Sequence, residues 1–150
     1  MSLPELAASP RTDIIEGKTF SPYTLESIGM FQSHLEQKHL ARVAIACTDL
    51  DDETGQKLMD SAQNFVVNGN LAYGTKAFNT QAIAVENLPF LLYIGLKDGD
   101  KKMTPTIAGK LINDENRAKV QRACLETGLG WVLPKNEQGE APKEQPLPPQ

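Results

Sequence analysis

The residues best suited to chemistry are four acids near the middle of the chain. Asp49 and Asp51 follow the apolar run 42–47, and Asp52 and Glu53 come directly after them. In an Asp-x-Asp pair, one carboxylate can attack phosphorus while the other moves a proton, so an Asp-based phosphatase is one alternative. No matching lysine and acidic pair follows later in the chain. The favoured interpretation is a helix start, in which Asp49 or Asp51 caps the helix and the other acids lie at its positive end.

The histidines and cysteines do not predict a metal site. His34 and His39 are five residues apart, which places them about 140° apart around a helix. One metal ion cannot be held by both from the same helix, and solvated or hydrogen-bonded histidines are expected instead. Cys47 and Cys124 are each isolated, so buried free thiols are expected. We therefore predict no metal, no cofactor and no catalytic residue, and the protein is not expected to be an enzyme.

Charge and hydropathy narrow the class of protein. The formal net charge of −4 argues against a general nucleic-acid binder, which usually carries a basic excess. The N-terminal residues do not have the pattern of a secretory signal. The longest apolar run, Leu88 to Leu96, is shorter than the ~20 residues of a membrane-spanning helix. We expect a soluble cytoplasmic protein that contacts neither nucleic acid nor membrane.

The elements that would position these residues are mostly helices. A Glu-Gly turn within 14–20 is compatible with a short β-hairpin. Thr24 is a good N-cap for a helix with apolar residues at helical spacing, and 42–47 could end that helix or form a strand. The helix that follows the acids is expected to stop at Asn68-Gly69-Asn70, and Thr80 is expected to cap the next one.

The stretch 82–130 carries the densest apolar pattern. Pro89 either kinks a helix or occupies the first turn of a new one capped by Asn87. Thr104-Pro105 predicts another helix start, and Asp114 is expected to restart the helix after a break. Gly128 is expected to end the last helix as its C′ residue. The only tryptophan, Trp131, is expected to fold back on the core.

These patterns predict a mainly α protein with one small domain. The helical domain is expected to span residues 14–133, with about four or five helices and a short β-hairpin near its N-terminus. Residues 1–13 are polar and proline-punctuated, which is typical of a flexible leader. Residues 134–150 are rich in Pro, Glu and Gln, which predicts a disordered tail.

A helix-turn-helix in residues 104–128 is a second alternative. Its last helix would carry Arg117, Lys119 and Arg122, and the segment as a whole is mildly basic. The turn, however, lacks the usual glycine and places two acids, Asp114 and Glu115, where DNA phosphates would approach. A DNA-binding function is therefore disfavoured.

Several short segments follow the order seen in a family of phage proteins. Gly17-Lys18-Thr19-Phe20 and Tyr23-Thr24-Leu25 match an early Gly-Lys-x-Phe…Leu-Thr-Leu segment, and Phe90 to Leu96 matches an apolar helix. Lys102-Met103-Thr104-Pro105 matches a Lys…Met-Thr-Pro turn, and Val120 to Gly128 matches a last helix that ends in Gly. Over residues 14–130 the chain resembles the tail assembly chaperones of long-tailed bacteriophages.

The resemblance implies a mainly α, non-catalytic protein of phage or prophage origin that acts in the bacterial cytoplasm. It also implies a homo-oligomer that binds a protein partner, namely the tape-measure protein or another tail protein, through apolar helical surface. The apolar run in the matched helix supplies the candidate partner-binding residues, with burial in the protein's own core as the alternative. These residues are Leu88, Phe90, Leu91, Tyr93 and Ile94.

Overall fold

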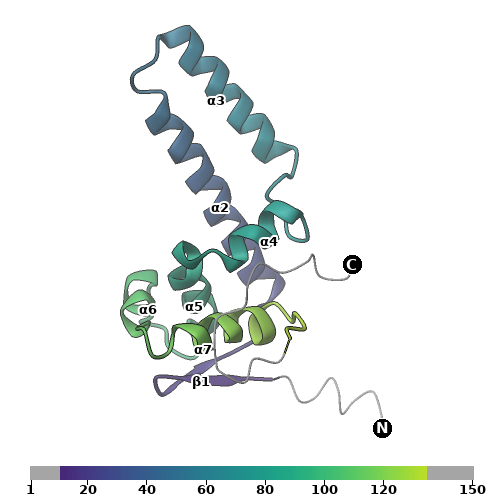
Figure 1. Cartoon of the computed structure of the whole chain (residues 1–150), viewed down its shortest axis with the longest axis vertical. Coiled ribbons are helices and arrows are strands. Elements are labelled where there is room, and N and C mark those ends of the chain that lie inside the picture. Colours follow the sequence, from purple (N-terminus) through teal and green to yellow (C-terminus); the bar gives the residue numbers. More distant parts are fainter. Residues whose placement is uncertain (1–10, 135–150) are drawn as a thin grey trace.

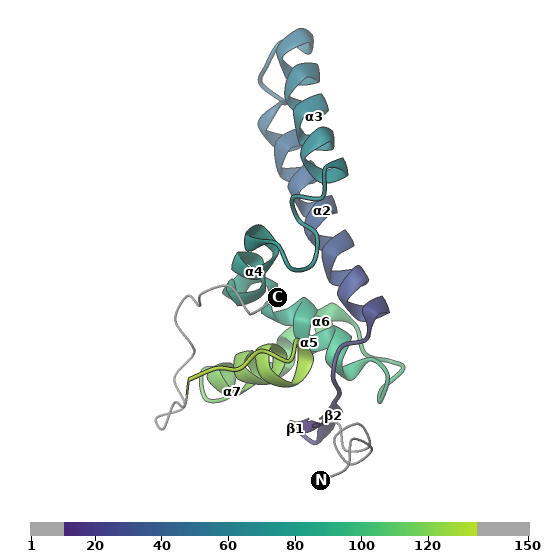
Figure 2. The same cartoon turned by 90° about the vertical axis from the view of Figure 1, so that its right-hand side faces the viewer.

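A pair of long helices projects from a body of shorter elements in the computed structural model (Figure 1). The structure describes residues 11–134. The body contains a small antiparallel hairpin and the helices that follow residue 75, while the projecting pair lies between them in sequence (Figures 1 and 2). The expected mainly α fold with an N-terminal β-hairpin is confirmed. The described part contains six α-helices, α2 to α7, slightly more than expected.

The hairpin pairs β1 (Asp13–Ile15) with β2 (Lys18–Phe20), and Asp13 lies opposite Phe20. Its two-residue turn has positive φ at both positions, 49° at Glu16 and 78° at Gly17. Such a turn matches the twist of the flanking strands, and glycine adopts it without strain. The hairpin places Ile15 and Phe20 in the core.

The projecting pair consists of α2 (Leu25–Ala46) and α3 (Asp52–Val67). The predicted cap is confirmed at Thr24, whose hydroxyl accepts a hydrogen bond from the Ser27 N–H. Because α2 runs to Ala46, the segment 42–47 belongs to a helix and not to a strand. α3 ends at Val67, directly before the predicted stop at Asn68-Gly69-Asn70, and Gly69 has a φ of +77°.

Four expected helix boundaries are wrong. α4 (Lys76–Ile83) begins after Thr75, whose hydroxyl accepts from the Phe78 N–H, so Thr80 lies inside the helix and caps nothing. A 3-10 turn, η1 (Val85–Asn87), then leads into α5 (Leu88–Leu96) with Pro89 in its first turn. Pro89 therefore starts a new helix, but the Asn87 side chain does not cap it. That side chain bonds Lys38 and Gln81 instead.

The third wrong boundary concerns Asp114. α6 (Pro105–Leu111) has the predicted Thr104 cap, and α7 (Arg117–Arg122) follows after a turn. In this turn the Asn113 side chain accepts from the N–H groups of residues 115 and 116. Asn113, and not Asp114, therefore organises the restart of the helix.

The last helix also ends differently from expectation. η2 (Ala123–Gly128) continues α7 as a π-helix, and the left-handed residue is Gly130, with a φ of +76°. Gly128 is glycine for another reason: a Cβ there would lie 2.5 Å from the ring of Tyr23. Trp131 is buried, as expected, and its backbone N–H donates to the Leu125 carbonyl.

α5 is the centre of the body and touches most of its other elements, α6 and α2 among them. Gly95 lets β2 approach closely, because a Cβ at this position would lie within 2.5 Å of three ring carbons of Phe20. The Ser21 N–H also donates to the Gly95 carbonyl at 3.0 Å. The expected leader and tail lie mostly outside the described residues, although Asp13 already belongs to β1.

Candidate interaction site

Three of the five predicted partner-binding residues lie in the core. Leu88, Leu91 and Ile94 are buried among other apolar side chains of this chain. Phe90 and Tyr93 are only partly buried and pack against the edge of the core. A partner can therefore touch Phe90 and Tyr93 without opening the fold, and these two residues mark the place where a site can exist.

An aromatic stack holds Phe90 and Tyr93 in place. The two rings meet edge to face with their centroids 5.7 Å apart, as expected for positions three residues apart on one helix face. The Phe90 ring also stacks on His34 of α2, with centroids 4.1 Å apart and an interplanar angle of 8°. Phe31 lies behind both and contacts Phe78 of α4 at 5.4 Å. The exposed rim is thus continuous with rigid core packing.

Burial gives His34 an electrostatic role in this stack. Partial burial lowers the pKa of His34, and the positive charge of Lys38 one turn later lowers it further. The imidazole is therefore neutral at pH 7, which suits a flat ring against the face of Phe90. The rim consequently presents an apolar surface at neutral pH.

An open depression adjoins this rim along the first half of α2. It has a volume of about 550 Å³ and is lined by residues of α2 and by one aromatic ring of α5. The lining residues are Glu26, Gly29, Met30, Ser33, His34, Gln37 and Phe90. Its size lies within the range of about 300–1,000 Å³ that is usual for ligand sites.

Gly29 has no function within the fold that the contacts explain. It lies in the second turn of α2, inside the helix, where glycine costs about 0.5–1 kcal/mol relative to alanine. A Cβ built at Gly29 meets no atom within 4 Å, so packing does not require its absence. The missing side chain leaves backbone exposed in the depression, where another helix could approach closely. Sequence inspection passed over Gly29, although a glycine inside a strong helical pattern is a usable signal.

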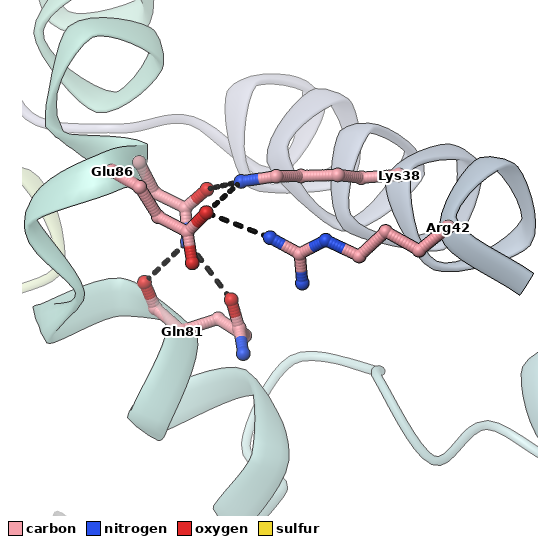
Figure 3. Close-up of polar contacts among 5 residues, drawn as sticks. Lys38, Arg42, Gln81 and Glu86 are labelled. Carbon is pink, nitrogen blue, oxygen red and sulfur yellow. Dashed lines mark hydrogen bonds and ion pairs between the residues drawn. The ribbon is translucent and has the colours of Figure 1, made fainter. Parts of the chain in front are cut away.

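A polar network fixes α2 against the base of the body below the projecting helices. The Glu86 carboxylate accepts from Lys38 at 2.9 Å and from Arg42 at 2.7 Å (Figure 3). Asn87 is fully buried, and its side-chain oxygen accepts a hydrogen bond from Lys38. Its side-chain NH2 donates to the backbone carbonyl and to the side-chain oxygen of Gln81. A cavity of about 50 Å³ beside this network is large enough for only one or two waters. We interpret the network as an anchor for α2.

The acids that suggested phosphatase chemistry are at the tip of the projecting helices. Asp51 is the N-cap of α3 and accepts from the Thr54 N–H at 2.6 Å, which lowers the pKa of its carboxyl group. Asp49 and Asp51 are both exposed, and neither lines one of the two depressions described above. Within residues 11–134 no three His, Cys, Asp or Glu side chains gather where they could hold a metal ion. The cap predicted for this segment is confirmed at Asp51.

The basic residues of the helix-turn-helix alternative face nearby acids. Arg117 forms an ion pair with Asp114 at 3.0 Å, and Arg122 forms one with Glu126 at 2.7 Å. Arg122 also donates to the carbonyl of Pro134. These contacts occupy two of the three cations that a DNA-binding interpretation needs for phosphates.

The two cysteines differ in environment. Cys124 is buried beside Tyr23, and burial raises the pKa of its thiol to about 12. Burial also raises the pKa of Tyr23, whose hydroxyl donates to the Leu91 carbonyl at 2.7 Å. Cys47 is half-buried at the end of α2. Neither cysteine belongs to the depression.

Comparisons of the chain with known protein families, with curated protein sequences and with solved structures find no match. Across residues 11–134, no helix combines the length and the hydropathy that crossing a membrane requires.

Proposed function

We propose that this protein is a non-catalytic binding protein that receives an apolar helix of a partner protein between α2 and α5. The observation that carries the proposal is the open depression bordered by Phe90, His34 and the bare backbone at Gly29. Binding of an amphipathic helix in such a groove needs an apolar rim and a place of close approach, and both are present. The rings are already held in place by the core, so binding costs them little additional conformational entropy.

The finer proposal is a tail assembly chaperone that binds a tape-measure protein or another tail protein and associates with itself. It is supported by the resemblance in the segments around Gly17, Phe90 and Met103. A tape-measure protein is a long helical chain with apolar surface, and a chaperone would cover that surface until tube subunits assemble around it. Such a partner fits a groove better than a small-molecule substrate would.

Tyr93→Asp tests the proposal directly. The charge would lie at the apolar rim, so capture of a partner helix should be lost while the helical circular dichroism of the protein stays unchanged. The probe is a co-expressed helical segment of a tape-measure protein. Val132→Asp is the matched control, because Val132 is a highly exposed apolar residue outside the depression.

Two results would count against the proposal. If Tyr93→Asp and Val132→Asp capture the helical segment as well as the wild type does, the depression is not the binding site. If Tyr93→Asp unfolds the protein, the rim is core, and Gly29→Leu then tests the depression from its other side. That variant fills the depression without inserting a charge or touching α5.

A further inference from the structure

His34 links the depression between α2 and α5 to the core. Its imidazole lines the depression together with Phe90, and the two rings are stacked nearly parallel. Phe31 lies further in, with its ring centroid 6.5 Å from that of His34. His34 is half-buried, so part of its ring is covered by Phe90 and the rest is open to the depression.

An apolar helix in the depression would cover the open part of this ring. Covering it removes water, which disfavours a charged imidazolium far more than a neutral imidazole. An apolar helix brings no carboxylate to replace that water. Glu26 is the one acid among the lining residues, but it precedes His34 by eight positions. It is therefore about 12 Å away along the helix axis, beyond the screening length of about 8 Å at physiological ionic strength.

The nearest charges also act against a positive His34. Lys38 lies one turn further along α2, and its charge contributes to the lowered pKa of His34. Lys38 is held where it is, because its Nζ donates to Glu86 and to the fully buried Asn87 (Figure 3). The Glu86 carboxylate could offset a charge on His34, but it already accepts from both Lys38 and Arg42.

The aromatic residues of α5 do not reverse this balance. The face of Phe90 attracts a cation, but Phe90 already stacks on His34 in the free protein. That attraction is present before and after a helix binds, so it cancels when the two states are compared. Tyr93 meets Phe90 edge to face and carries a neutral hydroxyl. What changes on binding is the water that His34 loses.

We propose that the depression is a pH-sensitive site, in which protonation of His34 weakens the binding of the partner helix. At neutral pH the imidazole completes a flat, uncharged rim. Once protonated, it must lose its water or leave the stack when the helix binds. Linkage makes the effect reciprocal, so a helix that binds the neutral form releases the proton. This inference rests on the proposed function, because it concerns the regulation of the same depression.

The sign and the range follow from this linkage. The pKa of His34 is lowered from 6.5 in the free protein, and covering the ring lowers it further. Well above pH 6.5 the histidine is neutral in both states, so the affinity does not depend on pH. Below the pKa of the free protein, the affinity falls by up to about tenfold per pH unit. The dissociation constant should therefore rise about threefold or more between pH 7.5 and 5.0.

Isothermal titration calorimetry at pH 7.5 and 5.0 tests the proposal with the full-length protein and a helical segment of a tape-measure protein that contains no histidine. The wild type should bind more weakly at pH 5.0, and circular dichroism should show it folded at both values. His34→Gln cannot gain a proton and should bind about equally at both. His39→Gln is the matched control: it removes the only other histidine, which contacts Phe65 and does not line the depression. It should keep the pH dependence of the wild type.

A count of released protons separates the charge of His34 from its packing. Titrations at pH 5.5 in two buffers of different ionisation enthalpy should show proton release on binding by the wild type and His39→Gln, but not by His34→Gln. If His34→Gln does not bind, the release measured for the other two proteins decides.

The outcomes distinguish this inference from the proposed function. Wild-type affinity that is equal at both pH values or tighter at pH 5.0, binding without proton release, or an unchanged pH dependence in His34→Gln would overturn the inference and leave the proposed function standing. A helical segment that binds at neither pH would overturn both.

Discussion

The sharpest test of the packing uses the same substitution at two glycines of similar setting. Gly95 in α5 and Gly29 in α2 both lie inside helices, and neither has a left-handed φ. Replacing glycine by alanine inside a helix is worth about 0.5–1 kcal/mol in stability when nothing obstructs the new methyl group. Any difference between the two variants therefore measures what surrounds each site.

At Gly95 the new methyl group has no room. Its Cβ would lie 2.5 Å from Cζ of Phe20 and closer still to Cε2 and Cδ2, whereas non-bonded carbons pack at about 3.5–4.0 Å. Phe20 is fully buried, so its ring cannot turn toward solvent. Overpacking costs up to about 3 kcal/mol, which leaves Gly95→Ala about 2 kcal/mol less stable after the helix gain is subtracted. At Gly29 only the gain remains, so Gly29→Ala should be about 0.5–1 kcal/mol more stable.

Urea and thermal unfolding followed by circular dichroism measure both variants. For a domain of this size, 1 kcal/mol shifts Tm by about 4 °C, so Gly95→Ala should melt about 8 °C below the wild type and Gly29→Ala about 2–4 °C above it. A neutral Gly95→Ala would refute the close packing of β2 on α5. A destabilised Gly29→Ala would mean that the depression is filled in the isolated protein.

Two further predictions use the cited pKa shifts. Burial raises the pKa of the Cys124 thiol to about 12. At pH 8 a thiol reagent should therefore label half-buried Cys47 readily, and it should label Cys124 only as fast as the protein unfolds. Equal labelling of both cysteines in the native protein would contradict the burial of Cys124. The lowered pKa of His34 means that below its ordinary value of 6.5 the unfolded chain binds more protons than the folded chain, so stability should fall as pH drops from 6.5. In urea titrations at pH 7.5 and 5.5, His34→Gln should lose less stability than the wild type, and an identical loss would contradict the assignment.

Local hydrogen bonding explains which elements could be predicted from the sequence. Thr24, Asp51 and Thr104 cap helices as expected, because each hydroxyl or carboxylate accepts from an N–H only three residues away. The β-hairpin was predictable for the same reason, since Glu16 and Gly17 define its turn. Such features depend on neighbours in the chain and not on the rest of the fold.

Two of the wrong boundaries depend on partners that are distant in sequence. Asn87 looked like a cap, but it bonds Lys38, 49 positions away, and is buried by that contact. Gly128 looked like a helix stop, but it makes room for Tyr23, which is more than a hundred residues earlier. These partners cannot be read from the residues next to Asn87 and Gly128. The local capping pattern was therefore overridden by tertiary packing at both positions.

Tertiary packing also decides which apolar residues of this chain are exposed. The run from Leu88 to Leu96 is its most hydrophobic segment, yet most of it is buried because α5 is surrounded by the body. α3 has fewer apolar residues than α5, but it is flanked mainly by α2. Leu58 and Phe65 therefore stay exposed. Exposure thus depends on how many neighbours an element has, and a projecting helix pair has few. A binding surface in this chain is therefore better sought along the edge of α2, at Gly29 on its first half, than on the face of α5 that fills the core.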